Sequence, residues 1–107
     1  MATMQDSLSV AANAVSANVL AGQLYEFVDP SSTVTVSVSG SATGLRTTFI
    51  CGVPLINDQA ISFQATSRFP LIPDDIMFTG QVPGGRMVLT FRNTTAGALT
   101  AFWRVDL

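Results

Sequence analysis

Residues 84–107 read GGRMVLTFRNTTAGALTAFWRVDL, and this stretch decides the predicted fold. Apolar and polar residues alternate over 86–92 and again over 99–107, on either side of the small-residue break 93–97. A period of two is typical of β-strands that are buried on one face. We therefore predict a β-hairpin here, with both apolar faces on the same side of one sheet.

Two registers of this hairpin keep the apolar faces together. The first pairs Phe91 with Leu99 around a loop that ends at Gly97, where glycine can take a positive φ. The second pairs Leu89 with Trp103 and gives an arginine of the first arm an oppositely charged partner. Loop chemistry favours the first register, and charge favours the second.

The same alternation continues upstream. Residues 33–39 and 45–51 are read as a second hairpin around the turn 40–44, because both stretches alternate cleanly. Further short strands are predicted at 24–28, 61–65 and 76–79. Seven or eight short strands at regular spacing, with no long helix, predict an all-β fold. We expect a single-domain antiparallel β-sandwich, jelly-roll-like in its connections.

The composition narrows the classes of function. Hydrophobic residues make up 48% of the 107 residues and charged residues 11%, with no lysine and no histidine. Five scattered arginines and a net charge of −2 do not make the basic surface of a nucleic-acid-binding protein. No apolar run approaches the roughly 20 residues of a membrane span. No basic segment precedes Leu8, so a signal peptide is not indicated and we expect synthesis inside the cell.

Residues 1–22 are small and nearly uncharged, and we expect them to form an arm that precedes a domain of residues 23–107. Apolar residues at helical spacing allow a helix, but the serines and asparagines among them compete with the helix through their own hydrogen bonds. We favour an extended arm that a neighbouring subunit ties down. Farther along, two prolines hold residues 69–73 extended.

Apolar side chains of these two segments are the ones expected to contact a partner. They are Leu8, Val10, Val15, Val19, Leu20, Phe69, Leu71 and Ile72. A small domain has much surface per residue, and few charges are present to cover it. Lysine, a common guard of edge strands, is missing. We therefore expect a homo-oligomer or a larger assembly, with a trimer favoured.

No convincing active site emerges from the sequence. Cys51 is the sole cysteine, in phase with apolar residues of its strand, and no histidine is present to activate it. The pair Asp74-Asp75 is read as a turn rather than a Ca²⁺ site, because adjacent residues of an extended chain point opposite ways. Glu26 and Asp58 would make a hydrolytic pair only if the fold brought them together. We expect no enzyme, no metal and no cofactor.

Two further features have an ordinary structural interpretation. The triplet Asn93-Thr94-Thr95 matches a glycosylation site, but asparagine at a loop start is also common turn chemistry. Trp103 could form a sugar-stacking shelf with Tyr25, but it is in phase with the apolar residues of its strand. We therefore expect Trp103 to lie in the core.

Five stretches of the chain resemble small structural proteins of tailed bacteriophages, in particular head decoration (cement) proteins. They are residues 9–13, 17–22, 69–70 with 73–75, and 85–95. The resemblance implies a loose N-terminal arm followed by a compact β domain. It further implies a virion component, often trimeric, that is assembled in the host cytoplasm and sits where shell subunits meet. Its partner would be the major capsid protein or another virion protein, and the resemblance supplies no catalytic residues.

A second hypothesis is a carbohydrate-binding module, as in a phage fibre or a small lectin. This hypothesis predicts that Trp103 or Tyr25 is exposed beside an aspartate or asparagine. A virion protein instead requires a surface that docks on a lattice, supplied by the arm and by the segment 69–73.

Overall fold

The computed structural model describes residues 3–23, 25–61 and 76–107, and these residues form eight strands. The strands are β1 (Thr3–Val10), β2 (Phe27–Val28), β3 (Thr33–Gly40), β4 (Leu45–Cys51), β5 (Val53–Ala60), β6 (Ile76–Gln81), β7 (Gly85–Asn93) and β8 (Leu99–Asp106). Within the described ranges, no helix is long and apolar enough to cross a membrane.

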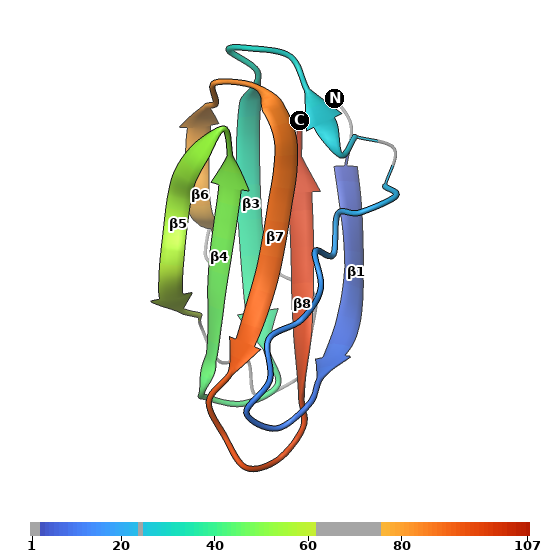
Figure 1. Cartoon of the computed structure of the whole chain (residues 1–107), viewed down its shortest axis with the longest axis vertical. Coiled ribbons are helices and arrows are strands. Elements are labelled where there is room, and N and C mark those ends of the chain that lie inside the picture. Colours follow the sequence, from blue (N-terminus) through green and yellow to red (C-terminus); the bar gives the residue numbers. More distant parts are fainter. Residues whose placement is uncertain (1–2, 24, 62–75) are drawn as a thin grey trace.

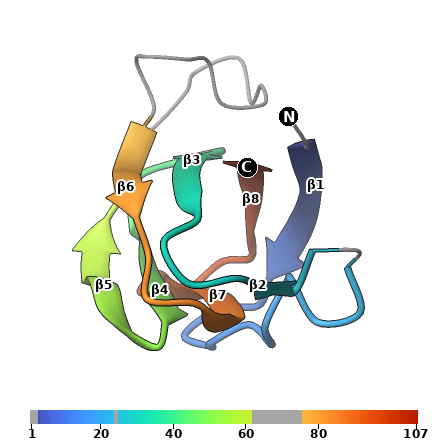
Figure 2. The ribbon, with the colours of Figure 1, turned by 90° about the horizontal axis from the view of Figure 1, so that it is seen from above.

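The strands form two four-stranded antiparallel sheets that face each other (Figure 1 and Figure 2). One sheet has the order β1-β8-β3-β6, and the other has the order β2-β7-β4-β5. Apolar side chains of both sheets fill the space between them, because each strand turns alternate residues inward. The predicted all-β, antiparallel sandwich is therefore confirmed.

The first strand of the chain pairs with the last, the second with the next to last, and so on inward. β1 pairs with β8, β2 with β7, β3 with β6 and β4 with β5. The chain is thus one long ribbon of paired strands, folded over so that β3 also pairs with β8 and β4 with β7. This connectivity is that of a jelly roll, in which most links between consecutive strands cross from sheet to sheet.

The predicted terminal hairpin is wrong in both registers. β7 and β8 lie in different sheets, so Phe91 is opposite Thr47 of β4, and Leu99 is opposite Val10 of β1. The break at residues 93–97 arches from one sheet to the other (Figure 1).

The physical reason is that alternation demands a cover for each apolar face without specifying the cover. A facing sheet hides an apolar face as well as a neighbouring strand does. Gly97 does not take the positive φ that the predicted loop needed. The predicted hairpin of 33–39 and 45–51 is wrong for the same reason, since β3 and β4 also lie in different sheets.

Both expectations for single core residues are confirmed. Cys51 is fully buried, and Trp103 is only 2% exposed. The other large core side chains include Phe49 and Phe91, which reach the same interior from β4 and β7.

The outer face of β3 is more buried than its sequence predicts. Ser37 and Ser39, polar residues that alternate with the buried valines of this strand, are themselves buried. β3 is an inner strand, and Ser37 lies between Ile76 of β6 and Arg104 of β8. Long side chains therefore flank the small serine on both neighbouring strands.

No strand is predicted at β5, whose residues Pro54, Asn57 and Asp58 are unfavourable in strands. β5 is an edge strand, where proline is tolerated because one side of the strand needs no partner. Its pairing with β4 is irregular, and Asp58 takes a positive φ of 49°. Of the strand predicted at 61–65, Ile61 is buried directly after β5, and the rest lies outside the described residues.

Of the described N-terminal residues, β1 is extended, as predicted, whereas residues 11–23 include turns, and the whole segment binds its own chain. β1 pairs along its whole length with β8, from Thr3 opposite Asp106 to Val10 opposite Leu99. The expected separation into an arm 1–22 and a domain is therefore not how the described residues pack. A neighbouring subunit is not needed to order this segment, because β1 pairs with the edge of β8 in its own chain.

Residues 13–19 then run along the free edge of β7, where side chains replace the missing backbone partners. Leu89 donates its N–H to Asn18 Oδ1 at 3.0 Å, and Phe91 donates its N–H to Ser16 Oγ at 2.9 Å. The N–H groups of Ser16 and Val19 donate in return to the carbonyls of Phe91 and Leu89. This segment occupies the hydrogen-bonding groups that an intruding strand would need.

Candidate functional site

The structure separates the predicted contact residues of the N-terminal segment into three groups. Val10 and Leu20 are buried in the core, so their assignment to a partner surface is wrong. Pairing of β1 with β8 turns Val10 inward. Leu8 and Val19 pack partly buried against the core, and Val15 is 63% exposed. The remaining predicted contacts lie outside the described residues: Phe69, Leu71 and Ile72.

Most of the large hydrophobic side chains that are exposed among the described residues lie toward one end of the sandwich. Three of the four found among the described residues are Tyr25, Phe27 and Val53, which we call the end patch. Tyr25 lies just before β2, and Phe27 is its first residue. Val53 is the first residue of β5, which begins at the same end of the molecule (Figure 1). Of these three residues, the sequence singled out only Tyr25 as a candidate for binding. The exposure of Phe27 depends on β2 being a short edge strand.

Close backbone contacts hold the loops of this end together. A Cβ added to Gly84 would lie 2.7 Å from the backbone nitrogen of Pro30. A Cβ added to Gly52 would lie 3.1 Å from the carbonyl oxygen of Gly84. Glycine is required at Gly84 both for this approach and for its φ of +94°. Three loops far apart in sequence therefore meet beneath the end patch.

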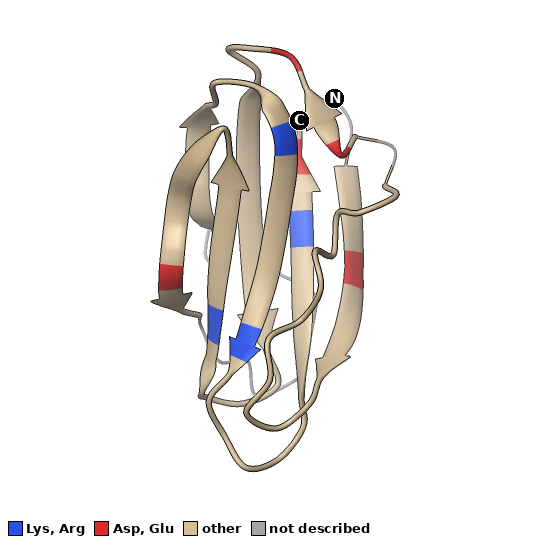
Figure 3. Ribbon diagram, viewed as in Figure 1, with Lys and Arg blue, Asp and Glu red and all other residues tan. Residues whose placement is uncertain are grey.

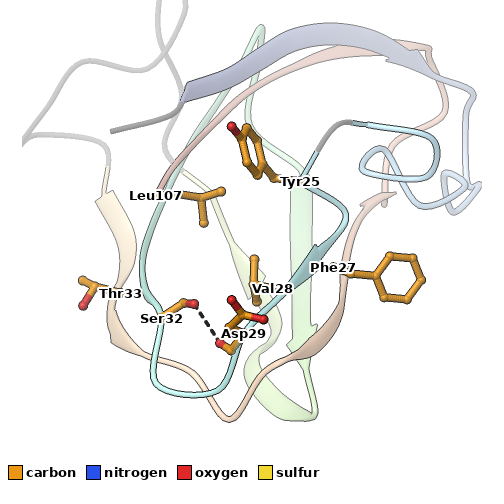
Figure 4. A pocket seen from close by; sticks show the side chains of 7 residues that line it. All are labelled: Tyr25, Phe27, Val28, Asp29, Ser32, Thr33 and Leu107. Atoms are coloured by element: carbon orange, nitrogen blue, oxygen red, sulfur yellow. Dashed lines mark hydrogen bonds between the residues drawn. The ribbon is translucent and has the colours of Figure 1, made fainter.

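A pocket of about 400 Å³ opens beside the end patch. Its lining comprises Tyr25, Phe27, Val28, Asp29, Ser32, Thr33 and Leu107. Figure 4 shows the side chains of Tyr25, Val28 and Leu107 directed into the opening, and those of Phe27 and Thr33 directed away from it. The carbonyl of Asp29 accepts hydrogen bonds from Ser32 Oγ at 2.7 Å and from the Ser32 N–H at 3.2 Å. This turn fixes the backbone that carries the Asp29 carboxylate.

A second, smaller pocket of about 220 Å³ lies between β1 and the segment that covers β7. Its lining includes Asp6, Leu8, Asn18, Val19 and Trp103. The indole of Trp103 is 2% exposed, so it does not offer the open stacking face that a sugar-binding shelf requires.

Every arginine that the structure describes is paired with a carboxylate, and Figure 3 shows how sparse the charges are. Arg86 Nε lies 2.5 Å from Glu26 Oε2. Arg104 Nε lies 3.0 Å from Asp106 Oδ2, and Thr3 Oγ1 donates to Asp106 Oδ1 at 2.6 Å. The described arginines thus form no basic patch.

Arg46 and Arg92 stand directly opposite each other on β4 and β7, a like-charge pair that is unfavourable by itself. Asp58 of β5 lies against both. Arg92 donates to it through Nε at 3.0 Å and Nη2 at 2.7 Å, and Arg46 Nε makes an ionic contact at 3.3 Å. The hydrogen bond from Arg92 lowers the pKa of Asp58, and the same bond raises the pKa of Arg92.

Glu26 and Asp58 are not brought together as a hydrolytic pair. Glu26 precedes β2 and Asp58 lies on β5, the two opposite edge strands of one sheet. The Gly22 N–H, which donates to Glu26 Oε1 at 3.0 Å, lowers the pKa of Glu26, and Arg86 lowers it further. Each carboxylate is therefore held ionised by its own partners.

Two described carboxylates contact no arginine, and each lines a pocket. Asp29 lines the larger pocket beside Tyr25, and Asp6 lines the smaller pocket beside Trp103. Asp6 Oδ1 accepts a hydrogen bond only from the neighbouring N–H of Ser7, at 2.8 Å. Neither pocket is lined by a described arginine.

The described residues contain no evident catalytic group. Burial raises the pKa of the Cys51 thiol, which keeps it protonated and unreactive. Within the described ranges, no three His, Cys, Asp or Glu side chains are grouped to hold a metal. Asp74 and Asp75 lie outside these ranges. Asn93 is buried and makes turn contacts as predicted, since its Oδ1 accepts from the Thr95 N–H at 2.8 Å.

Comparisons of this chain with protein-family models, with curated protein sequences and with solved structures found no match. The resemblance to head decoration proteins therefore stays a prediction. The fold alone does not choose a function, because viral capsid domains and lectins both use jelly rolls.

Proposed function

We propose that this chain is a structural virion protein, a capsid decoration protein that binds the head shell and stabilises contacts between shell subunits. The observation that carries the proposal is the end patch. Tyr25, Phe27 and Val53 are 39%, 68% and 47% exposed on a molecule whose described arginines each contact a carboxylate. An exposed apolar group on a weakly charged surface is typical of an interaction site.

The proposed mode of docking differs from the one expected from sequence. Residues 3–22 are engaged with their own β8 and β7, so the end patch takes the role assigned to the arm. The segment with Phe69, Leu71 and Ile72 stays a predicted second contact. The proposed partner is the major capsid protein or another virion protein, and the chain acts as a homo-oligomer, with a trimer favoured, in the virion.

Particle association tests this proposal directly. Particles are banded on a density gradient from a culture that makes the chain, and the band is analysed by mass spectrometry. Particles stripped of the chain are then incubated with the purified protein and sedimented. We expect the chain in the particle band in a fixed ratio to the shell protein, and saturable rebinding. A chain that stays at the top of the gradient in both experiments contradicts the proposal.

A carbohydrate-binding module is the second candidate function. One observation favours it, because Tyr25 is partly exposed and lines a pocket together with Asp29. Trp103 does not support it, since the indole is buried. A glycan array probed with the purified protein tests this candidate, and binding that Tyr25→Ala removes would support it.

A further inference from the structure

We infer that the pocket lined by Tyr25, Val28, Asp29 and Leu107 binds a basic side chain, lysine or arginine, of the protein on which this chain docks. The inference rests on the proposed function in one respect, namely that the occupant belongs to a protein partner. The chemistry of the pocket itself is argued from the described residues and can be tested without particles.

Charge is the first argument. The three described carboxylates Glu26, Asp58 and Asp106 are paired with arginines, whereas Asp29 has no cationic partner among the described residues. Asp29 lines a concave site from which described cations are absent, so an incoming cation finds an uncompensated acceptor. The same surroundings disfavour an anionic ligand.

The walls of the pocket supply the second argument. Val28 and Leu107 offer aliphatic surface, and the ring of Tyr25 is directed into the same opening (Figure 4). Lysine and arginine carry a cation on an aliphatic stem, which packs along apolar surface while the charged end reaches a polar group. A cation is also attracted by the face of an aromatic ring. The apolar wall therefore suits the aliphatic stem of a basic side chain, and the ring and the carboxylate suit its charged end.

A neutral sugar matches the pocket less well. Sugars need several polar groups to bind their hydroxyls, and one of the two aliphatic hydroxyl side chains of the lining, Ser32, already donates to the carbonyl of Asp29. The other, Thr33, is directed away from the opening (Figure 4). The polar side-chain groups that remain for a ligand are the Asp29 carboxylate and the Tyr25 hydroxyl.

The described part of this chain does not fill the site itself. The sequence has no lysine, and each of the four described arginines is bound to a carboxylate elsewhere. No described residue supplies the cation, so we assign it to the partner, and the end patch beside the pocket supplies the apolar contact that such a partner would share.

The experiment is a titration of the ¹⁵N-labelled full chain, followed by amide chemical shifts. The probe is Nα-acetyl-lysine N-methylamide, and the corresponding norleucine derivative serves as its uncharged analogue. We expect saturable shifts of the amides of Val28, Asp29 and Ser32 with the lysine probe. Removing the charge of the probe should weaken binding about tenfold or more, since a hydrogen bond to a charged group is lost.

Two variants make the result specific. Asp29→Asn should weaken the lysine probe about tenfold or more, whereas Asp6→Asn, which removes the same charge beside the smaller pocket, should leave its affinity unchanged. Tyr25→Leu keeps the apolar wall without the ring and should weaken binding about two- to fivefold. If Asp29→Asn does not fold, the unaltered chain still decides, because binding of the lysine probe should weaken as ionic strength rises.

Three outcomes overturn the inference. The first is the absence of saturable shifts at the pocket, or shifts of equal affinity for the lysine and norleucine probes. The second is a methyl glycoside that binds there while the lysine probe does not, which assigns the pocket to carbohydrate. The third is spermidine binding far more tightly than the lysine probe, which assigns the pocket to a free amine. None of these outcomes depends on particle sedimentation, so failure of the proposed function is scored separately.

Discussion

The side chain of Asn18 accepts a hydrogen bond from the backbone N–H of Leu89, 71 residues farther along the chain, at 3.0 Å. The same carbonyl oxygen accepts the N–H of Leu20, and the amide nitrogen donates to the carbonyl of Met87. One side chain thus satisfies two points on the edge of β7 where no strand pairs.

We expect Asn18→Ala to lower the free energy of unfolding by about 1–3 kcal/mol. The substitution leaves the N–H of the buried Leu89 without its acceptor, and unmade bonds of buried groups are costly. Urea unfolding measures the change. Asn57→Ala is the matched control, because Asn57 is exposed on β5 and should change stability by no more than about 0.5 kcal/mol. Equal effects of the two substitutions would contradict the role assigned to Asn18.

Gly84 and Gly85 provide a comparison of two adjacent glycines with positive φ. Alanine at Gly85 meets nothing within 4 Å and carries only the strain of its φ of +104°, of order 1–3 kcal/mol. Alanine at Gly84 carries a similar strain, and its Cβ would also lie 2.7 Å from the backbone of Pro30. We therefore expect Gly84→Ala to lower the melting temperature clearly more than Gly85→Ala. A calorimetric scan of both variants checks the order, and the reverse order would be inconsistent with the loop contact.

Asp58 predicts an acid dependence of stability. Its pKa is lowered in the folded chain, so its contribution is fully present above its ordinary pKa of 3.8 and is lost as pH falls through the lower folded value. Asp58→Asn should destabilise the chain at neutral pH, because it leaves Arg46 opposite Arg92 without the carboxylate. The variant should also lose less stability than the unaltered chain below about pH 3.8.

Urea midpoints measured from pH 7 to pH 2 test this expectation. Asp6→Asn shows whether loss of any one carboxylate has the same effect, since Asp6 contacts no arginine. Parallel pH curves for the unaltered chain and Asp58→Asn would refute the assignment.

Phe27 and Val15 separate the two surfaces proposed for particle binding. Both side chains are exposed to a similar extent, 68% and 63%, so serine at either position should change stability by no more than about 0.5 kcal/mol. We expect Phe27→Ser to weaken rebinding to stripped particles and Val15→Ser to leave it unchanged, as measured by sedimentation. The opposite result would return the contact to the N-terminal segment.

The sequence alone determined much of the local structure. The alternation over 45–51 and over 86–92 located strands and their buried faces correctly, and Cys51 and Trp103 were recognised as core from phase alone. Alternation is a local property of the chain, since successive side chains of any strand point to opposite faces. The alternation is therefore the same whichever strand pairs with this one in the folded chain.

Only the tertiary structure decided which strands are neighbours. The predicted hairpins failed because β7 and β8, and likewise β3 and β4, face each other across the core instead of pairing. The same long-range pairing placed β1 on β8, which turned Val10 from a predicted contact into core.

The candidate site could not be predicted from the sequence either. Tyr25, Asp29 and Leu107 converge only because the fold brings the residues that flank β2 next to the end of β8. Composition did indicate a surface with few charges, but the carboxylates left without arginines became visible only once each arginine had its partner in space. Pairing and charge neutralisation depend on distances between residues far apart in sequence, and a period of two contains no information about those distances.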